Sequence, residues 1–299
     1  MEQEKEGKEG VIKHLVISGG GPAGFSFYGA IKECHHRGLW SFENLESMHG
    51  ISIGAILCAI FCLNYEWPVL DDFLIKRPWK QVFQMNMYTI IDSFQRRGIY
   101  DVKVIENTFS PLFAGKDISI NVTLKEFYEI VGIDLHIYAT EIHSYNLVDF
   151  SHKTHPDWRL VDAIYCSCCL PVAFSPLLRD GCCYCDGGVI SNYPLRQCLE
   201  GGADLGEVLG VKMSIDRTNQ ARVHSESSIF DYIIVIFNKI MEKRLLAADL
   251  IENHIAYELK IESPQISIYN AYSIISSQEE RARLIDYGVE EAIRQLAFS

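Results

Sequence analysis

Apolar positions along the chain form short runs, each followed by a turn and a longer apolar stretch. Residues 14–18 predict a buried strand, a glycine-rich turn follows at 19–24, and a helix is expected to about residue 36. The same order recurs at 48–61, where a short strand, Ser52 and a continuously apolar helix follow one another. Two strand–turn–helix units predict a parallel sheet with helices on its faces.

The rest of the chain alternates between helical and strand patterns. Residues 66–131 are mostly helical by pattern, and we expect them to cap one face of the sheet. Helix breaks are expected in this stretch at Pro68, Pro78, Gly98 and Pro111. The sequence also predicts strands at 135–140, 147–150 and 207–213, and helices at 159–169, 229–250 and 278–296.

Composition supports a globular α/β protein. Of the 299 residues, 48% are hydrophobic and 22% are charged, which excludes a disordered chain. The 39 acidic and 27 basic side chains give a formal net charge of -12. This balance argues against nucleic acid as a partner, because a polyanion requires clustered Lys and Arg. It also opposes long-range attraction to an anionic membrane, although a local basic or apolar face can still dock there.

The polar first ten residues lack the apolar region of a secretory signal, so a frayed tail is expected. The sequence contains no apolar run of about 18 residues that would predict a spanning helix. Ten cysteines without a signal indicate free thiols in a reducing compartment, by default the cytosol. Six of them lie at 166–169 and 182–185 without the paired spacing of a zinc site, which favours small packed side chains over a metal.

Three short motifs carry candidate chemistry, and the first surrounds Ser52. Gly50-Ile-Ser52-Ile-Gly54 matches the G-x-S-x-G nucleophile elbow, in which flanking glycines relieve the crowding of a sharp strand-to-helix turn. The strand lies before the serine and the helix after it, as the motif requires. The dipole of that helix would also favour negative charge at the serine.

The second motif is the glycine loop with Gly19, Gly20, Gly21 and Gly24, and it has two interpretations. It resembles the start of a flavin- or nicotinamide-binding unit, which would require a strand ending in an acidic residue about twenty positions later. Glu43 and Glu46 lie at that distance, but residues 40–46 are too polar for a central strand. We therefore favour an oxyanion hole, with Gly20 and Gly21 as the main N–H donors.

The third motif is Asp186-Gly187-Gly188, which alone would be read as a hairpin turn. Together the three motifs resemble the patatin-like phospholipase family in order and approximate spacing: S-G-G-G-x-x-G at 18–24, G-x-S-x-G at 50–54, and D-G-G with a downstream Asn192 and Pro194. The segment 162–176, a helix leading into Pro-x-x-Phe-x-Pro, is similar as well.

This resemblance implies a three-layer α/β/α fold with a central, mostly parallel sheet. It covers residues 13–212, so we expect a polar tail at 1–12 and a helical extension at 213–299 packed on the same domain. It also implies a Ser-Asp dyad with Ser52 as nucleophile, Asp186 as base and the loop of Gly19, Gly20, Gly21 and Gly24 as oxyanion hole. The implied substrates are phospholipids or acylglycerols, cleaved at an ester without a cofactor or metal.

Three alternatives remain beside this interpretation. A Ser-His-Asp triad would place a histidine after the acid, where only His224 and His254 are found, and neither has a marked loop context. A lipid-binding or storage protein could keep the fold with little catalysis. The apolar run 229–237, followed by Lys239, Lys243 and Arg244, fits either a core helix, which we favour, or an interfacial helix with a basic rim, so peripheral membrane contact stays open.

Overall fold

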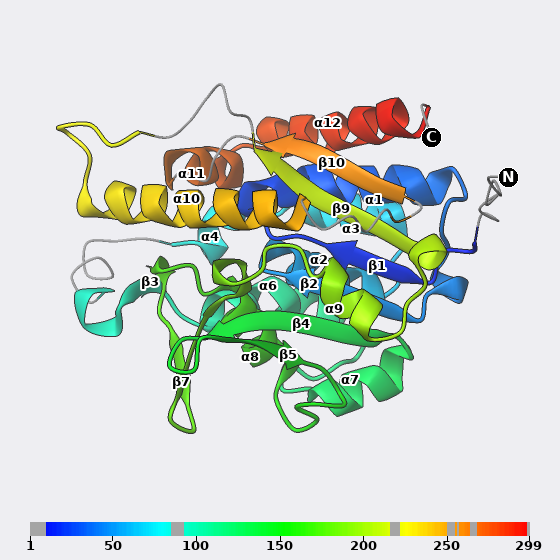
Figure 1. The fold of residues 1–299 in the computed structure, drawn as a ribbon, viewed down its shortest axis with the longest axis horizontal. Helices are drawn as coiled ribbons and strands as arrows, with labels where there is room; N and C mark the ends of the chain where they lie inside the picture. Colours follow the sequence, from blue (N-terminus) through cyan, green and yellow to red (C-terminus); the bar gives the residue numbers. More distant parts are fainter. Residues whose placement is uncertain are drawn as a thin grey trace, which may run out of the picture.

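The central feature of the computed structural model is a large mixed sheet with helices on both faces (Figure 1). The structure describes residues 10–84, 93–215, 222–249, 255, 257–263 and 268–297. Within these residues, eight strands form one sheet in the order β10-β9-β1-β2-β4-β8-β7, and β5 also pairs with β4. The bounds are β1 His14–Ile17, β2 Ser47–Ile51, β4 Asp134–Glu141, β5 Asn146–Phe150, β7 Leu177–Arg179, β8 Cys182–Asp186, β9 Val208–Ile215 and β10 Tyr257–Ser263.

The sheet is parallel from β10 to β4 and antiparallel where β5, β7 and β8 join. A separate two-stranded sheet pairs β3 (Gly98–Tyr100) with β6 (Val172–Phe174). The helices are α1 Gly24–His36, α2 Ile53–Cys62, α3 Trp67–Lys76, α4 Trp79–Val82, α6 Lys103–Ala114, α7 Leu124–Val131, α8 Leu160–Cys168, α9 Leu195–Glu200, α10 Ile229–Asp249, α11 Ile268–Ser276 and α12 Gln278–Leu296. The expected three-layer α/β/α fold is confirmed.

The two faces of the sheet have different chemistry. Leu15, Ile17 and Met48 belong to a large apolar cluster that also contains buried residues of α1, α2, α6 and α7, as expected for a cover over this face. Val16 points to the other face, where a small cluster with Tyr193 and residues of α9 covers it. The alternation follows from the strand period of two residues.

The proline at 111 does not break its helix, contrary to the sequence-based expectation. Pro111 lies inside α6 and has no N–H for the carbonyl of Asn107, one turn earlier. The Arg77 guanidinium donates to the carbonyl oxygens of Asn107 and Thr108, the latter at 2.7 Å. A distant arginine therefore supplies the donor that the proline lacks, and α6 continues to Ala114.

The segment after 212 contains a strand as well as helices. β10 was not predicted, and it extends the central sheet by pairing in parallel with β9. α12 packs along α1 at two glycines: a Cβ added at Gly29 would lie 2.1 Å from the Ile285 carbonyl oxygen, and one at Gly288 would lie 1.9 Å from that of Ser26. The C-terminal elements are thus packed on the core that the earlier elements form.

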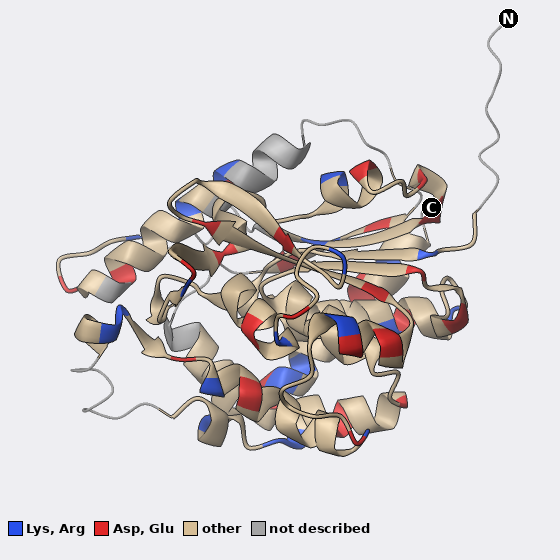
Figure 2. Ribbon diagram, turned by 90° about the horizontal axis from the view of Figure 1, so that it is seen from below, with Lys and Arg blue, Asp and Glu red and all other residues tan. Residues whose placement is uncertain are grey.

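Acidic and basic residues are interspersed along the ribbon, in helices, strands and loops alike (Figure 2). In the described part of the chain, no helix combines the length and the apolar character needed to cross a membrane.

Candidate active site

Ser52 occupies a strained turn between β2 and α2. Its φ of 55° and ψ of -123° are rare for a residue with a side chain. The turn is so tight that a Cβ at Gly50 would lie 2.6 Å from backbone atoms of Gly54, and one at Gly54 would lie 2.3 Å from the Ile17 carbonyl oxygen. The predicted elbow is therefore present, and its two glycines are required by close backbone approach.

A buried serine that the sequence analysis did not single out holds this elbow. The Ser52 N–H donates to Ser167 Oγ at 2.8 Å, and the Ser167 hydroxyl donates to the Tyr138 carbonyl oxygen at 2.6 Å. Ser167 lies on α8 and is fully buried. Its two hydrogen bonds connect the elbow, α8 and the central strand β4, so α8 fixes the direction in which Ser52 is presented.

Asp186 lies at the end of β8, directly beside Ser52. The Ser52 side chain lies close enough to this carboxylate to lower its pKa, and the Gly188 N–H donates to Oδ1 at 2.8 Å. Burial raises the pKa of Asp186 to about 6, against the lowering effect of the Gly188 N–H and the Ser52 side chain. Gly187 is needed here, because a Cβ would lie 2.5 Å from the Tyr138 carbonyl oxygen. The structure thus brings together the serine and the carboxylate of two separate motifs.

The glycine loop lies against the same turn. The Gly19 N–H donates to the Asn192 carbonyl oxygen at 3.0 Å, and Asn192 Nδ2 donates back to the Gly19 carbonyl oxygen at 3.1 Å. The Gly24 N–H is used within its own turn, the short helix η1 (Gly21–Ala23). Among the described residues, the N–H groups of Gly20 and Gly21 have no protein acceptor. These two amides are the ones available to a bound group.

Several cysteines surround the pair. The buried Cys168 thiol lies near the Ser52 side chain, and the backbone N–H of Asp186 donates to the Cys169 carbonyl oxygen at 3.0 Å. All ten cysteines have free thiols. Within the described ranges, no group of three or more His, Cys, Asp or Glu side chains is arranged to hold a metal ion. The thiols act as small packing groups that exclude water from the carboxylate and raise its pKa.

No histidine joins the pair in the described part of the chain. Ser52 has no hydrogen bond to an imidazole there, His224 is exposed, and His254 lies outside the described residues. The segment 40–46, which a dinucleotide site would need as a strand, is a short turn of 3₁₀ helix at Phe42–Asn44. The strand ending at Glu43 or Glu46 that a dinucleotide site would need is therefore absent from this segment.

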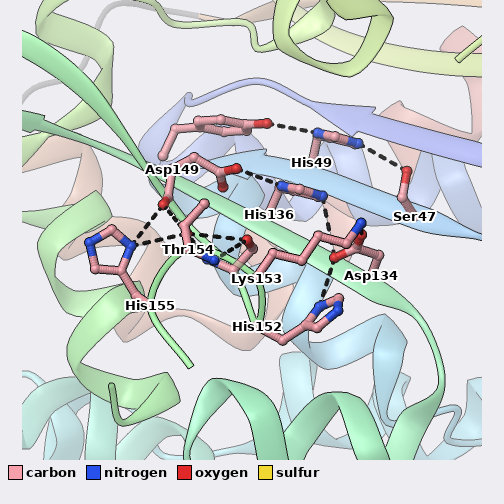
Figure 3. A network of polar contacts seen from close by, with 11 residues as sticks. Ser47, His49, Asp134, His136, Asp149, His152, Lys153, Thr154 and His155 are labelled. Carbon is pink, nitrogen blue, oxygen red and sulfur yellow. Dashed lines mark hydrogen bonds and ion pairs between the residues drawn. The ribbon is translucent and has the colours of Figure 1, made fainter. Parts of the chain in front are cut away.

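A buried polar network, which the sequence analysis did not predict, lies on the face of the sheet away from the large apolar cluster (Figure 3). His49 bonds Ser47 and the Tyr138 hydroxyl, each at 2.9 Å, and stacks on His136. Burial lowers the pKa of His136, but the carboxylates of Asp134 and Asp149 outweigh it and raise the pKa to about 9. Tyr138 connects this network to the elbow, because its carbonyl oxygen accepts the hydrogen bond from Ser167.

The protein has an α/β fold, and its candidate site combines a serine elbow, a buried carboxylate beside that serine, and two glycine N–H groups without a protein acceptor among the described residues. Comparison with known proteins supports the same class. Residues 15–199 match the model of the patatin-like phospholipase family, which is more than half of the chain. The chain therefore belongs to the patatin-like phospholipase family, and this membership supports lipid hydrolase activity.

Two viral proteins match the chain in sequence, and a bacterial protein matches it in fold. The uncharacterized protein R571 of Acanthamoeba polyphaga mimivirus is 24% identical over 238 residues, covering 77% of this chain and 76% of that protein. The probable lipid hydrolase 463L of Invertebrate iridescent virus 6 is 26% identical over 185 residues, covering 61% of this chain and 62% of that protein. The crystal structure of VipD from Legionella pneumophila has a TM-score of 0.55 at 18% identity, covering 96% of this chain and 67% of that one, which is a likeness of fold.

Proposed function

We propose that this protein is a serine acyl hydrolase that cleaves carboxylic esters of phospholipids or acylglycerols with a Ser52–Asp186 dyad. The observation that carries the proposal is the position of the Ser52 side chain, at a strained elbow and close enough to the buried Asp186 carboxylate to lower its pKa. A carboxylate with an ordinary pKa near 4 is a weak base toward a hydroxyl. Burial makes Asp186 a stronger proton acceptor, so it can act without an intervening histidine.

The reaction would proceed in two steps. Ser52 Oγ attacks the ester carbonyl carbon while Asp186 takes the hydroxyl proton, and the tetrahedral intermediate expels the alcohol with that proton, leaving an acyl-serine. Water then attacks the acyl-serine, Asp186 accepts a proton from it, and the fatty acid leaves as Ser52 regains its hydrogen. The dyad requires no metal ion for either step.

Negative charge develops on the carbonyl oxygen in both steps. The N–H groups of Gly20 and Gly21 are the proposed oxyanion donors, because Gly19 and Gly24 already donate to backbone carbonyls. Each such donor is typically worth about 3 kcal/mol in the transition state. The N-terminus of α2 adds a favourable dipole at Ser52.

A fluorophosphonate probe tests the proposal directly. We expect covalent labelling of the wild-type protein at Ser52, found by peptide mass spectrometry, and no labelling of Ser52→Ala. Lipid profiling after incubation with mixed glycerolipids would then identify the ester that is cleaved. An unlabelled Ser52 in a folded protein would instead favour a lipid-binding role without catalysis.

The rate should depend on pH through Asp186. The carboxyl group must be ionised to accept a proton, and its pKa is about 6. We therefore expect kcat/KM for a soluble ester to rise with pH, to be half-maximal near pH 6 and to level off above it. Carboxyl ionisation has almost no temperature dependence, whereas imidazole ionisation has a large one. A midpoint that moves markedly between two temperatures would point to a histidine base.

A further inference from the structure

The outward face of α10 carries an unusual row of exposed apolar side chains. Ile229, Tyr232, Ile236 and Ile240 are 62%, 52%, 43% and 37% exposed. At 3.6 residues per turn, these four positions fall within roughly 80° of the helix circumference. Ile234 and Phe237, by contrast, are buried on the inner side. The helix is thus apolar toward both the core and solvent. It therefore has features of the core helix and of the interfacial helix, the two interpretations considered from the sequence.

The charged residues of this helix are also divided between its outward and inner sides. Lys239 and Lys243 are exposed and share the outward arc, whereas Asp231 and Glu242 lie toward the inner side by the same periodicity. Asp231 accepts hydrogen bonds from the Ser228 N–H and hydroxyl, at 2.9 Å and 2.8 Å, and Glu242 pairs with Lys239. In a protein of net charge -12, this face therefore presents lysines and apolar groups together.

The helix that carries this face lies next to the candidate active site. α10 packs against η3 (Gly187–Val189), the turn that follows Asp186, and α11 packs against η1 of the glycine loop. Tyr272 of α11 is also exposed, and the Lys80 ammonium group lies 5.4 Å from the centre of its ring. A surface that covers α10 would therefore lie beside both loops that surround Ser52.

We propose that the outward face of α10 docks on a lipid surface, its apolar row entering the interface and its lysines contacting anionic headgroups. The proposal rests on the proposed function, since a lipid ester has to pass from an aggregate to Ser52. An amphipathic helix with an apolar row and a lysine rim is the arrangement that binds in the plane of an interface.

The test uses full-length protein carrying Ser52→Ala, so that vesicles stay intact. Co-sedimentation is measured with vesicles of phosphatidylcholine, alone or mixed with phosphatidylglycerol. We expect Ile236→Glu/Ile240→Glu to weaken binding to both by at least about tenfold. The matched control is Ile130→Glu/Ile293→Glu, which changes two exposed isoleucines of α7 and α12 and should leave binding unchanged. Lys243→Gln should lower binding about fivefold on the mixed vesicles alone.

The same variants with Ser52 restored separate docking from catalysis. Ile236→Glu/Ile240→Glu should hydrolyse a monomeric short-chain ester at the wild-type rate and vesicle lipid at least about tenfold more slowly. Equal vesicle binding by this variant and its control would overturn the proposal, as would a wild-type protein that binds neither vesicle. A wild-type dimer that the double substitution dissociates would assign the face to a second copy instead. Loss of vesicle binding in a protein without esterase activity would uphold docking and reject the proposed function.

Discussion

Asp186→Asn is expected to lower kcat for ester hydrolysis by about 10³-fold or more, and Ser52→Ala to lower it to background. General-base catalysis contributes typically about 10²- to 10⁴-fold, and among the described residues no other carboxylate or imidazole is found beside the Ser52 side chain. Initial rates on a chromogenic ester measure both effects. The matched control is Asp180→Asn, the same chemical change in the β7–β8 turn, where the side chain is 86% exposed. Near-normal turnover by Asp186→Asn would disprove the dyad.

The same substitution should not destabilise the fold. The pKa of Asp186 in the folded protein, about 6, lies above the unfolded value of about 4. The ionised carboxylate therefore costs folding free energy, and this cost grows as pH rises between the two values. Asparagine stays neutral and can still accept from the Gly188 N–H. At pH 8 we expect a melting temperature equal to or above that of the wild type, which separates lost chemistry from lost structure.

The largest effect on stability is expected at Arg281. This side chain is 2% exposed on α12, and its guanidinium donates to five backbone carbonyl oxygens at the ends of α3 and α11. The acceptors are those of Leu74, Ile75, Arg77, Ile274 and Ile275. Arg281→Met should lower the free energy of unfolding by about 3–5 kcal/mol, because it leaves several buried carbonyls without a donor.

Urea unfolding followed by circular dichroism measures this loss. Arg283→Met is the matched control, two residues along the same helix, where the side chain is 67% exposed and pairs with Glu280. It should change the unfolding free energy by less than about 0.5 kcal/mol. Arg281→Lys keeps the charge but offers three donors in place of five, so an intermediate loss is expected. Equal stability of Arg281→Met and Arg283→Met would contradict this account of α12.

The elbow and the order of the first elements could be predicted from sequence because their causes are local. Gly50 stands where the backbone returns on itself within a few residues, and the apolar run at 53–61 marks the helix by itself. Gly54 meets the Ile17 carbonyl oxygen of β1 instead, and only the G-x-S-x-G pattern identified it. The partnership of Ser52 with Asp186 could not be obtained this way. It became visible through resemblance to a family, since the two residues are far apart in the chain and meet through sheet pairing.

The features that were missed depend on partners distant in sequence. Ser167 holds the Ser52 N–H across 115 positions, and Arg77 compensates for Pro111 from another helix. β10 has a mixed polar and apolar composition because it lies at the edge of the sheet, where one neighbour is absent. The sequence analysis considered histidines only as partners for a catalytic serine, whereas His49 bonds Ser47 and Tyr138 within β2 and β4 (Figure 3).

The close contact of α1 with α12 has a consequence during synthesis. α1 begins at the glycine loop, and Gly29 packs against a carbonyl of α12 that is made more than 250 residues later. A nascent chain that already contains Ser52 and Asp186 still lacks the helix against which α1 rests. The packing of α1, the helix that follows the glycine loop, is therefore completed only after α12 has been synthesised.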